Sequence, residues 1–204
     1  MPDSALFNHL PALLNRLKRL AIEAGEVTLD YFDEGGYDNA MVKEDGSPLT
    51  LADQAAEDLI TAELMEIDPS VPIIGEEAAA QGKLPELGDN SYFWLVDPLD
   101  GTKEFISGSG DYTVNIALIK DGKPLLGIVY APFHGELYSG IVGQGAWRWL
   151  EDNNHEKDIR TRKAPKEGLS IVASKSHGSG EKLDKFLEGF KINKLVKRGS
   201  SLKI

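Results

Sequence analysis

The chain has 204 residues, of which 41% are hydrophobic and 27% are charged, a composition typical of a folded protein with one sizeable core or two small ones. Its 33 acidic residues outnumber its 22 basic ones, and the net charge of −11 argues against binding to duplex nucleic acid, which depends on cations that neutralise phosphates. The absence of cysteine excludes disulfides, thiol catalysis and zinc–thiolate sites. We find neither a secretory leader nor an apolar run of about 18 residues that would suggest a transmembrane segment, and therefore expect a cytoplasmic protein.

The charge is divided unevenly along the chain. Residues 1–154 carry 9 basic and 27 acidic groups, whereas residues 155–204 carry 13 basic and 6 acidic groups. An acidic part that holds cations beside a basic part that binds anions would suit a metal-assisted reaction on a phosphorylated small molecule. Two differently solvated surfaces would produce the same asymmetry.

Two long helices are predicted near the N-terminus. Apolar residues recur at three- and four-residue spacings over residues 5–33, which predicts an amphipathic helix that two adjacent glycines then stop. Thr50 and Asp53 resemble a capping pair for a second helix over about 51–67, which Pro69 would end.

Short runs of apolar and β-branched residues predict the strands, and a Lys-Asp-Gly-Lys-Pro turn predicts a hairpin between two of them. The expected strands are 71–74, 92–96, 112–119, 125–130, 136–142, 169–173 and 192–196, with a further helix over 181–187. A polar segment over 151–167 marks the expected boundary between an N-terminal α+β part, residues 1–155, and a smaller α/β part, residues 156–204.

Two of the expected strands end in carboxylates. Glu76 and Glu77 follow the first, and Asp97 and Asp100 follow the second. Charges at the end of a buried strand are costly unless something compensates them. Hard divalent cations prefer oxygen ligands, and Mg²⁺ is commonly held by a few carboxylates together with substrate phosphate and water. A magnesium site is the economical interpretation, and a turn whose Asp side chains cap backbone amides is the alternative.

The residues next to these acids suit an anionic substrate. Gly101 lets backbone N–H groups approach an anion closely, and the hydroxyl of Thr102 could orient a water molecule. A hydroxyl is too weak a base to activate water alone, so Asp53 is a candidate carboxylate partner. Asp53 would also be favoured near a helix N-terminus with no chemical role at all.

These motifs together resemble a known family. Gly-Glu-Glu at 75–77 followed by Trp-Leu-Val-Asp-Pro-Leu-Asp-Gly-Thr at 94–102 resembles the signature of the inositol monophosphatase superfamily of Mg²⁺-dependent, lithium-sensitive phosphatases. The continuation Lys-Glu-Phe at 103–105 is similar to the 3′(2′),5′-bisphosphate nucleotidase branch, of the CysQ type. The similarity also covers residues 43–53, 173–177 and 199–203. It therefore spans nearly the whole chain, and implies layers of helices and sheets in the sugar-phosphatase manner.

The resemblance implies the metal ligands. Glu76, Asp97, Asp100 and the carbonyl of Leu99 would bind two or three Mg²⁺ ions, with Asp97 bridging two of them. Glu76 would also belong to the catalytic group.

The resemblance also implies roles around the substrate. Asp53 and Thr102 would position the attacking water, and the phosphate to be cleaved would lie against the amides of Gly101 and Thr102. Without the motifs around them, His177 and Lys203 would be interpreted as ordinary surface residues. The rest of the nucleotide would be contacted by His177, Ser200 and Lys203.

The implied function is hydrolysis of the 3′-phosphate of adenosine 3′,5′-bisphosphate to AMP and phosphate. It would serve nucleotide recycling in sulfur assimilation, in the cytoplasm or peripheral to the inner membrane. An inositol or sugar monophosphatase of the same superfamily is an alternative. The family's C-terminal Trp-Asp motif, whose Asp completes the second metal site, is absent from the sequence. We therefore expect a C-terminally incomplete fold, and a catalytically silent metal or nucleotide binder is a further alternative. The oligomeric state stays open.

Overall fold

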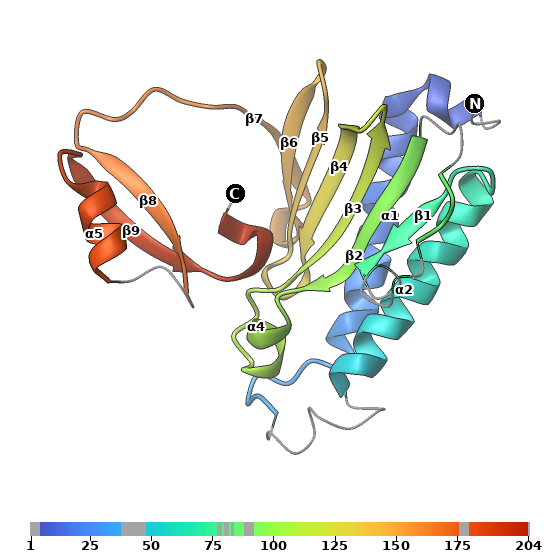
Figure 1. The fold of residues 1–204 in the computed structure, drawn as a ribbon, viewed down its shortest axis with the longest axis horizontal. Helices are drawn as coiled ribbons and strands as arrows, with labels where there is room; N and C mark the ends of the chain where they lie inside the picture. Colours follow the sequence, from blue (N-terminus) through green and yellow to red (C-terminus); the bar gives the residue numbers. More distant parts are fainter. Residues whose placement is uncertain are drawn as a thin grey trace.

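The computed structural model describes residues 5–37, 48–76, 79, 82, 84–87, 92–175 and 180–203. Figure 1 shows two long helices on one face of a large sheet, and a smaller unit of two strands and one helix beyond its other face. This arrangement confirms the expected mixed α/β class. Among the described residues, no helix combines the length and the hydropathy that crossing a bilayer requires.

The first long helix, α1 (Leu10–Leu29), is shorter than predicted at both ends. A separate 3₁₀ turn, η1 (Ala5–Asn8), precedes it. The side chain of His9 accepts a hydrogen bond from the amide of Ala12, and a proline stands in the first helical turn. Because that proline has no N–H to donate, it is tolerated only at the start of a helix, and the α-helix proper begins there.

The second long helix, α2, spans Pro48–Ile67. The predicted capping pair at Thr50 and Asp53 is wrong as a helix start, because both residues lie inside the helix. Pro48 stands at the first helical position instead, where its fixed φ suits the conformation.

The large sheet has seven strands in the order β1-β2-β3-β4-β5-β6-β7. The first two strands are parallel, and every later pair is antiparallel. The strands are β1 (Ile73–Gly75), β2 (Tyr92–Asp100), β3 (Thr113–Lys120), β4 (Lys123–Ala131), β5 (Glu136–Ile141), β6 (Gly145–Leu150) and β7 (His155–Ile159). The sequence patterns missed β6 and β7, and β7 carries the large sheet a little past the boundary expected at residue 155.

The predicted hairpin joins β3 to β4. Its two central residues, Asp121 and Gly122, have φ values of 50° and 72°. Two consecutive positive φ values match the twist of the flanking strands, which is why Asp-Gly is a frequent sequence in such turns.

The smaller unit consists of β8 (Leu169–Ser174), α5 (Glu181–Leu187) and β9 (Ile192–Arg198). The two strands are parallel, and all three elements were predicted. A 3₁₀ turn, η4 (Ser200–Lys203), follows β9. This turn lies between the smaller unit and the large sheet (Figure 1).

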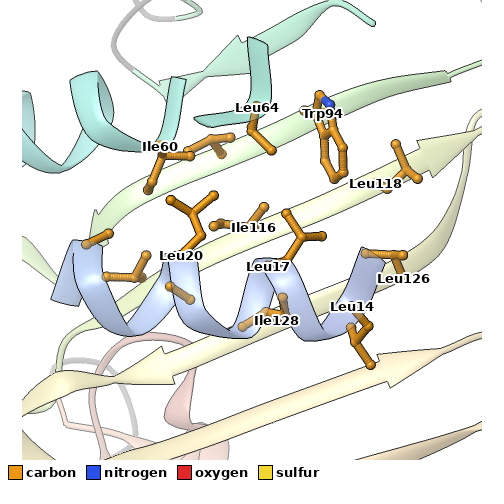
Figure 2. Packing of buried hydrophobic residues seen from close by; sticks show 14 of the residues in the cluster. Leu14, Leu17, Leu20, Ile60, Leu64, Trp94, Ile116, Leu118, Leu126 and Ile128 are labelled. Carbon is orange, nitrogen blue, oxygen red and sulfur yellow. The ribbon is translucent and has the colours of Figure 1, made fainter. Parts of the chain in front are cut away.

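The main core lies between the two helices and the large sheet (Figure 2). Alternate residues of β3 point toward the helices, and the best-buried side chains interlock there. Burying a side chain of this size stabilises the fold by roughly 1.5–3 kcal/mol. The fully buried members include Leu13, Leu17, Leu20, Ile60, Leu64, Trp94, Ile116, Leu118 and Ile128.

A second, smaller core lies under the turn that follows β2. It is made by Ala52, Leu99, Phe105 and Tyr112. The rings of Phe105 and Tyr112 meet edge to face, with centroids 5.0 Å apart. This cluster holds the end of β2 and the short helix α4 (Thr102–Ile106) against α2. It therefore positions the acidic segment at the end of β2, residues 97–100.

Candidate active site

The ends of β1 and β2 bring two acidic residues together. Gly75 pairs with Val96 in the parallel ladder, so Glu76 and Asp97 leave neighbouring strands at the same edge. Their carboxyl groups are hydrogen-bonded to each other. Glu76 is exposed, whereas Asp97 is half-buried.

The pKa of Asp97 is raised from its ordinary 3.8 to about 8, first by burial and then by the negative charges of Glu76 and Asp100. The amide of Leu99 donates to Asp97 Oδ1 at 3.2 Å and opposes this shift. A carboxyl group that is half-buried between two like charges is unstable as an anion unless a cation joins it.

The segment from Asp97 to Asp100 departs from regular strand geometry. The register between β2 and β3 shifts between these two residues, while Pro98 and Leu99 are buried. The bond from the Leu99 amide to the Asp97 side chain is of the kind expected for an Asp turn. The turn and the acid cluster are therefore both present, and they do not exclude each other.

Three hydrogen bonds converge on one oxygen of Asp100. Its Oδ2 accepts from the Ser201 amide at 2.7 Å, from the Ser201 hydroxyl at 2.8 Å and from the Ser200 hydroxyl at 2.5 Å. These donors come from η4, one hundred residues further along the chain. The turn thus connects the smaller unit to the acidic segment.

Gly101 connects Asp100 to α4. Its φ of +101° lies in a region that side chains disfavour. A Cβ atom at this position would lie 2.9 Å from Ser200 Cβ and 3.0 Å from the carbonyl oxygen of Asp111. Both the backbone conformation and the close packing therefore require glycine. Thr102, the first residue of α4, is exposed.

The other expected site residues are distributed around this segment. Asp53 is half-buried in α2, which is in contact with α4. The ammonium group of Lys203 donates to the carbonyl of Ser200. His177 and Glu77 lie outside the described residues.

A hollow of about 330 Å³ adjoins the acids on the sheet face opposite the helices. Asp97, Asn115 and Ser201 contribute its polar lining, and Leu95, Ala117 and Val129 its apolar lining. It offers space for part of a small molecule beside Asp97.

As the side chains stand, no group of three acidic or histidine residues among the described ones is arranged to hold a metal ion. The donor set nevertheless fits Mg²⁺, which takes one or two protein carboxylates and keeps several waters. Asp97 supplies a half-buried carboxyl group whose like-charged neighbours call for a compensating cation, and Glu76 and Asp100 supply further oxygens.

The sequence reasoning missed Asp111, which is buried and accepts four hydrogen bonds or ion pairs. Its partners are His134 Nε2 at 3.0 Å, Arg198 Nη1 at 2.9 Å, the Gly199 amide at 3.2 Å and Lys175 Nζ at 2.6 Å. Burial raises the pKa of this carboxyl group, but these donors lower it more, and the net shift is downward. One feature of the sequence could have indicated Asp111: polar residues stand at alternate positions at the start of an apolar strand, namely Asp111, Thr113 and Asn115.

Comparison with known proteins identifies the family of this chain. The model of the inositol monophosphatase family matches residues 11–203, and the chain therefore belongs to that family.

Within the family, the similarity is to proteins named CysQ. The chain is 41% identical over 191 residues to the 3′(2′),5′-bisphosphate nucleotidase CysQ of Buchnera aphidicola, covering 94% of this chain and 69% of the relative. It is 38% identical to the CysQ of Escherichia coli K12, covering 94% of this chain and 74% of the relative. The crystal structure of CysQ from Bacteroides thetaiotaomicron superposes with a TM-score of 0.73 at 30% identity, covering 94% of this chain and 74% of that one. The expected family and branch are confirmed.

Proposed function

We propose that the chain is a Mg²⁺-dependent phosphatase that removes the 3′-phosphate of adenosine 3′,5′-bisphosphate, giving AMP and phosphate. The observation that carries the proposal is the strand-end acid pair of Glu76 and Asp97 beside Asp100, Gly101 and Thr102. The 38–41% identity to proteins named as 3′(2′),5′-bisphosphate nucleotidases supports this substrate class.

The proposed reaction is a direct displacement by water. When bound, Mg²⁺ would neutralise charge on the phosphoryl and leaving oxygens. Glu76, Asp97, Asp100 and the carbonyl of Leu99 would hold it. The water oxygen forms a bond to phosphorus as the bond from phosphorus to O3′ breaks. O3′ leaves with the bonding electron pair and takes a proton from solvent water, which gives the free 3′-hydroxyl group.

The chain's other groups position the reactants. Asp53 and Thr102 orient the water, with the Asp53 carboxylate accepting its proton. The amides of Gly101 and Thr102 donate to the phosphate. The backbone of Ser200 and the side chain of Lys203 contact the second phosphate or the sugar, because the Ser200 hydroxyl is engaged with Asp100. His177 completes that set.

The test is to measure phosphate release from adenosine 3′,5′-bisphosphate and inositol 1-phosphate, each with and without Mg²⁺. Faster Mg²⁺-dependent turnover of the bisphosphate supports the proposal, and preference for inositol phosphate would assign the chain to the other activity. Absence of turnover on both substrates, with Mg²⁺ still raising the melting temperature, would leave a silent metal binder.

A pair of charge-removing variants makes the test specific. Asp97→Asn should abolish turnover, whereas Asp121→Asn removes the same charge in the exposed β3–β4 turn. Turnover should be unchanged in Asp121→Asn, because Asn also tolerates a positive φ.

A further inference from the structure

Three polar residues on one face of β3 and its approach contact three successive residues of the segment that enters η4. We call Asp111, Thr113 and Asn115 the polar triplet. They lie two positions apart, so their side chains share one face of the strand. Asp111 accepts from the Gly199 amide, Thr113 bonds to Ser200, and Asn115 donates to Ser201. The Thr113–Ser200 and Asn115–Ser201 distances are 2.8 Å and 3.3 Å.

The direction of these hydrogen bonds is determined by the carboxylate at their end. The Ser200 and Ser201 hydroxyls both donate to Oδ2 of Asp100, and a hydroxyl has only one proton to donate. Thr113 must therefore donate to Ser200, as Asn115 donates to Ser201. Two chains of hydrogen bonds thus run from β3 through the serines to one oxygen of Asp100.

The serine turn has a backbone conformation that needs support. Ser200 has a φ of +50°, which lies in the left-handed region. This conformation is unfavourable for a residue with a side chain, and persists only where the surrounding structure holds it. Asp111 contributes to that support. It is 2% exposed, and it binds the Arg198 side chain and the Gly199 amide immediately before Ser200. Lys175 ties the end of β8 to the same carboxylate.

We infer that Asp111 is a positioning residue for the proposed metal site, acting through the Ser200–Ser201 turn on Asp100. Three donors occupy Oδ2 of Asp100, which orients the carboxylate and directs Oδ1 to other partners. Residues that hydrogen-bond a metal-ligating carboxylate set its orientation, and their loss typically costs about 10- to 100-fold in metal affinity. The inference rests on the proposed function only in taking Asp100 as a Mg²⁺ ligand.

The test compares Asp111→Asn with Glu136→Gln. Glu136 is a matched control, because it is a half-buried carboxylate that accepts from Arg148 at 2.6 Å and from Tyr138 at 2.7 Å in β5 and β6. The first readout is amide hydrogen exchange of residues 199–201 in the metal-free protein. The second is the Mg²⁺ concentration that gives half of the maximal rise in melting temperature.

We expect Asp111→Asn to speed exchange at residues 199–201 and to raise the half-maximal Mg²⁺ concentration by about tenfold or more, and Glu136→Gln to change neither. Asp111→Glu, which keeps the charge, should restore most of the Mg²⁺ response. If Asp111→Asn does not fold, a second variant, Thr113→Val, removes the hydrogen bond to Ser200. It should shift both readouts in the same direction. Unchanged exchange, an unchanged Mg²⁺ response or a wild-type protein that ignores Mg²⁺ would overturn the inference. Because neither readout measures turnover, a failure of the proposed substrate alone leaves this test decisive.

Discussion

Glu76 and Asp97 share a hydrogen bond at the ends of two parallel strands, although both are carboxylic acids. Two carboxylates this close repel each other when both are ionised, and Asp97, whose pKa is raised to about 8, keeps its proton at neutral pH when no cation is bound. The same proton must leave when a divalent cation binds between them.

The first prediction is that Mg²⁺ binding strengthens as the pH rises toward 8. Below the raised pKa of Asp97, about 8, the cation must displace a proton, so the half-maximal Mg²⁺ concentration should fall by about tenfold per pH unit. Thermal shift measured at pH 6, 7 and 8 would check this, and a response that does not change with pH would contradict it.

The second prediction concerns the stability of the metal-free protein. Between pH 4 and 8 the folded chain binds more protons at Asp97 than the unfolded chain, since the folded pKa exceeds the ordinary 3.8. The contribution of this residue to the free energy of unfolding therefore falls as the pH rises through that range. Asp97→Asn should remove this loss and raise the melting temperature at pH 8 relative to wild type, while abolishing the response to Mg²⁺. A variant less stable than wild type at pH 8 would show that the carboxyl group supports the fold.

The third prediction is that Gly101→Ala costs more stability than the same substitution at Gly122. At Gly101 a positive φ coincides with contacts of 2.9 and 3.0 Å for the new Cβ atom, so we expect a loss of about 1–3 kcal/mol in stability together with loss of turnover. Gly122→Ala has a similar positive φ of 72° with open space around it, and should lose stability from backbone strain alone. Urea unfolding of both variants separates the two effects, and equal losses would show that the packing against Ser200 is unimportant.

The fourth prediction is that Lys203 contributes to substrate discrimination. Its side chain lies on η4, against the Ser200 carbonyl, beside the segment that contacts Asp100. Lys203→Ala should reduce kcat/KM for the bisphosphate more than for a monophosphate, with the larger change in KM. Lys194→Ala, at an exposed position of β9, is the control. Equal losses on both substrates would assign Lys203 a structural role.

The fifth prediction tests the core between α2 and the sheet. Leu64 is 1% exposed and its neighbour Met65 is 50% exposed. Leu64→Ala should cost about 2–5 kcal/mol, because it leaves a cavity, whereas Met65→Ala should change stability by roughly 0.5 kcal/mol or less. Chemical denaturation gives both values, and similar losses would mean that the helix face is assigned wrongly.

The sequence predicted those elements whose residues carry their own periodic pattern. The leucines of α1 and the alternating residues of β3 were recognisable because burial on one face imposes a period of 3.6 or 2. Strand β7 was missed because all but one of its residues are exposed, so no apolar alternation marks it. The start of α2 was misplaced because Thr50 and Asp53 have the right spacing for a cap, while Pro48 takes the first position.

The candidate site was predictable only in part for a similar reason. Local motifs identified the acids at 76, 97 and 100, since each closely follows a short apolar run. The link from Ser201 to Asp100 joins residues 101 positions apart, and no local pattern reveals such a pairing. Asp111 was missed because its four partners come from three separate parts of the chain.

The seven strands of the large sheet lie side by side in the order in which the chain makes them (Figure 1). Most of its antiparallel pairs close through short turns, so little loop entropy opposes their formation, and such pairings form quickly. The bond from Thr113 to Ser200 closes a separation of 87 residues and needs β3 to be in place first. During refolding, burial of Trp94 should therefore precede the ability to bind Mg²⁺, and the interval between the two signals would measure the docking of η4.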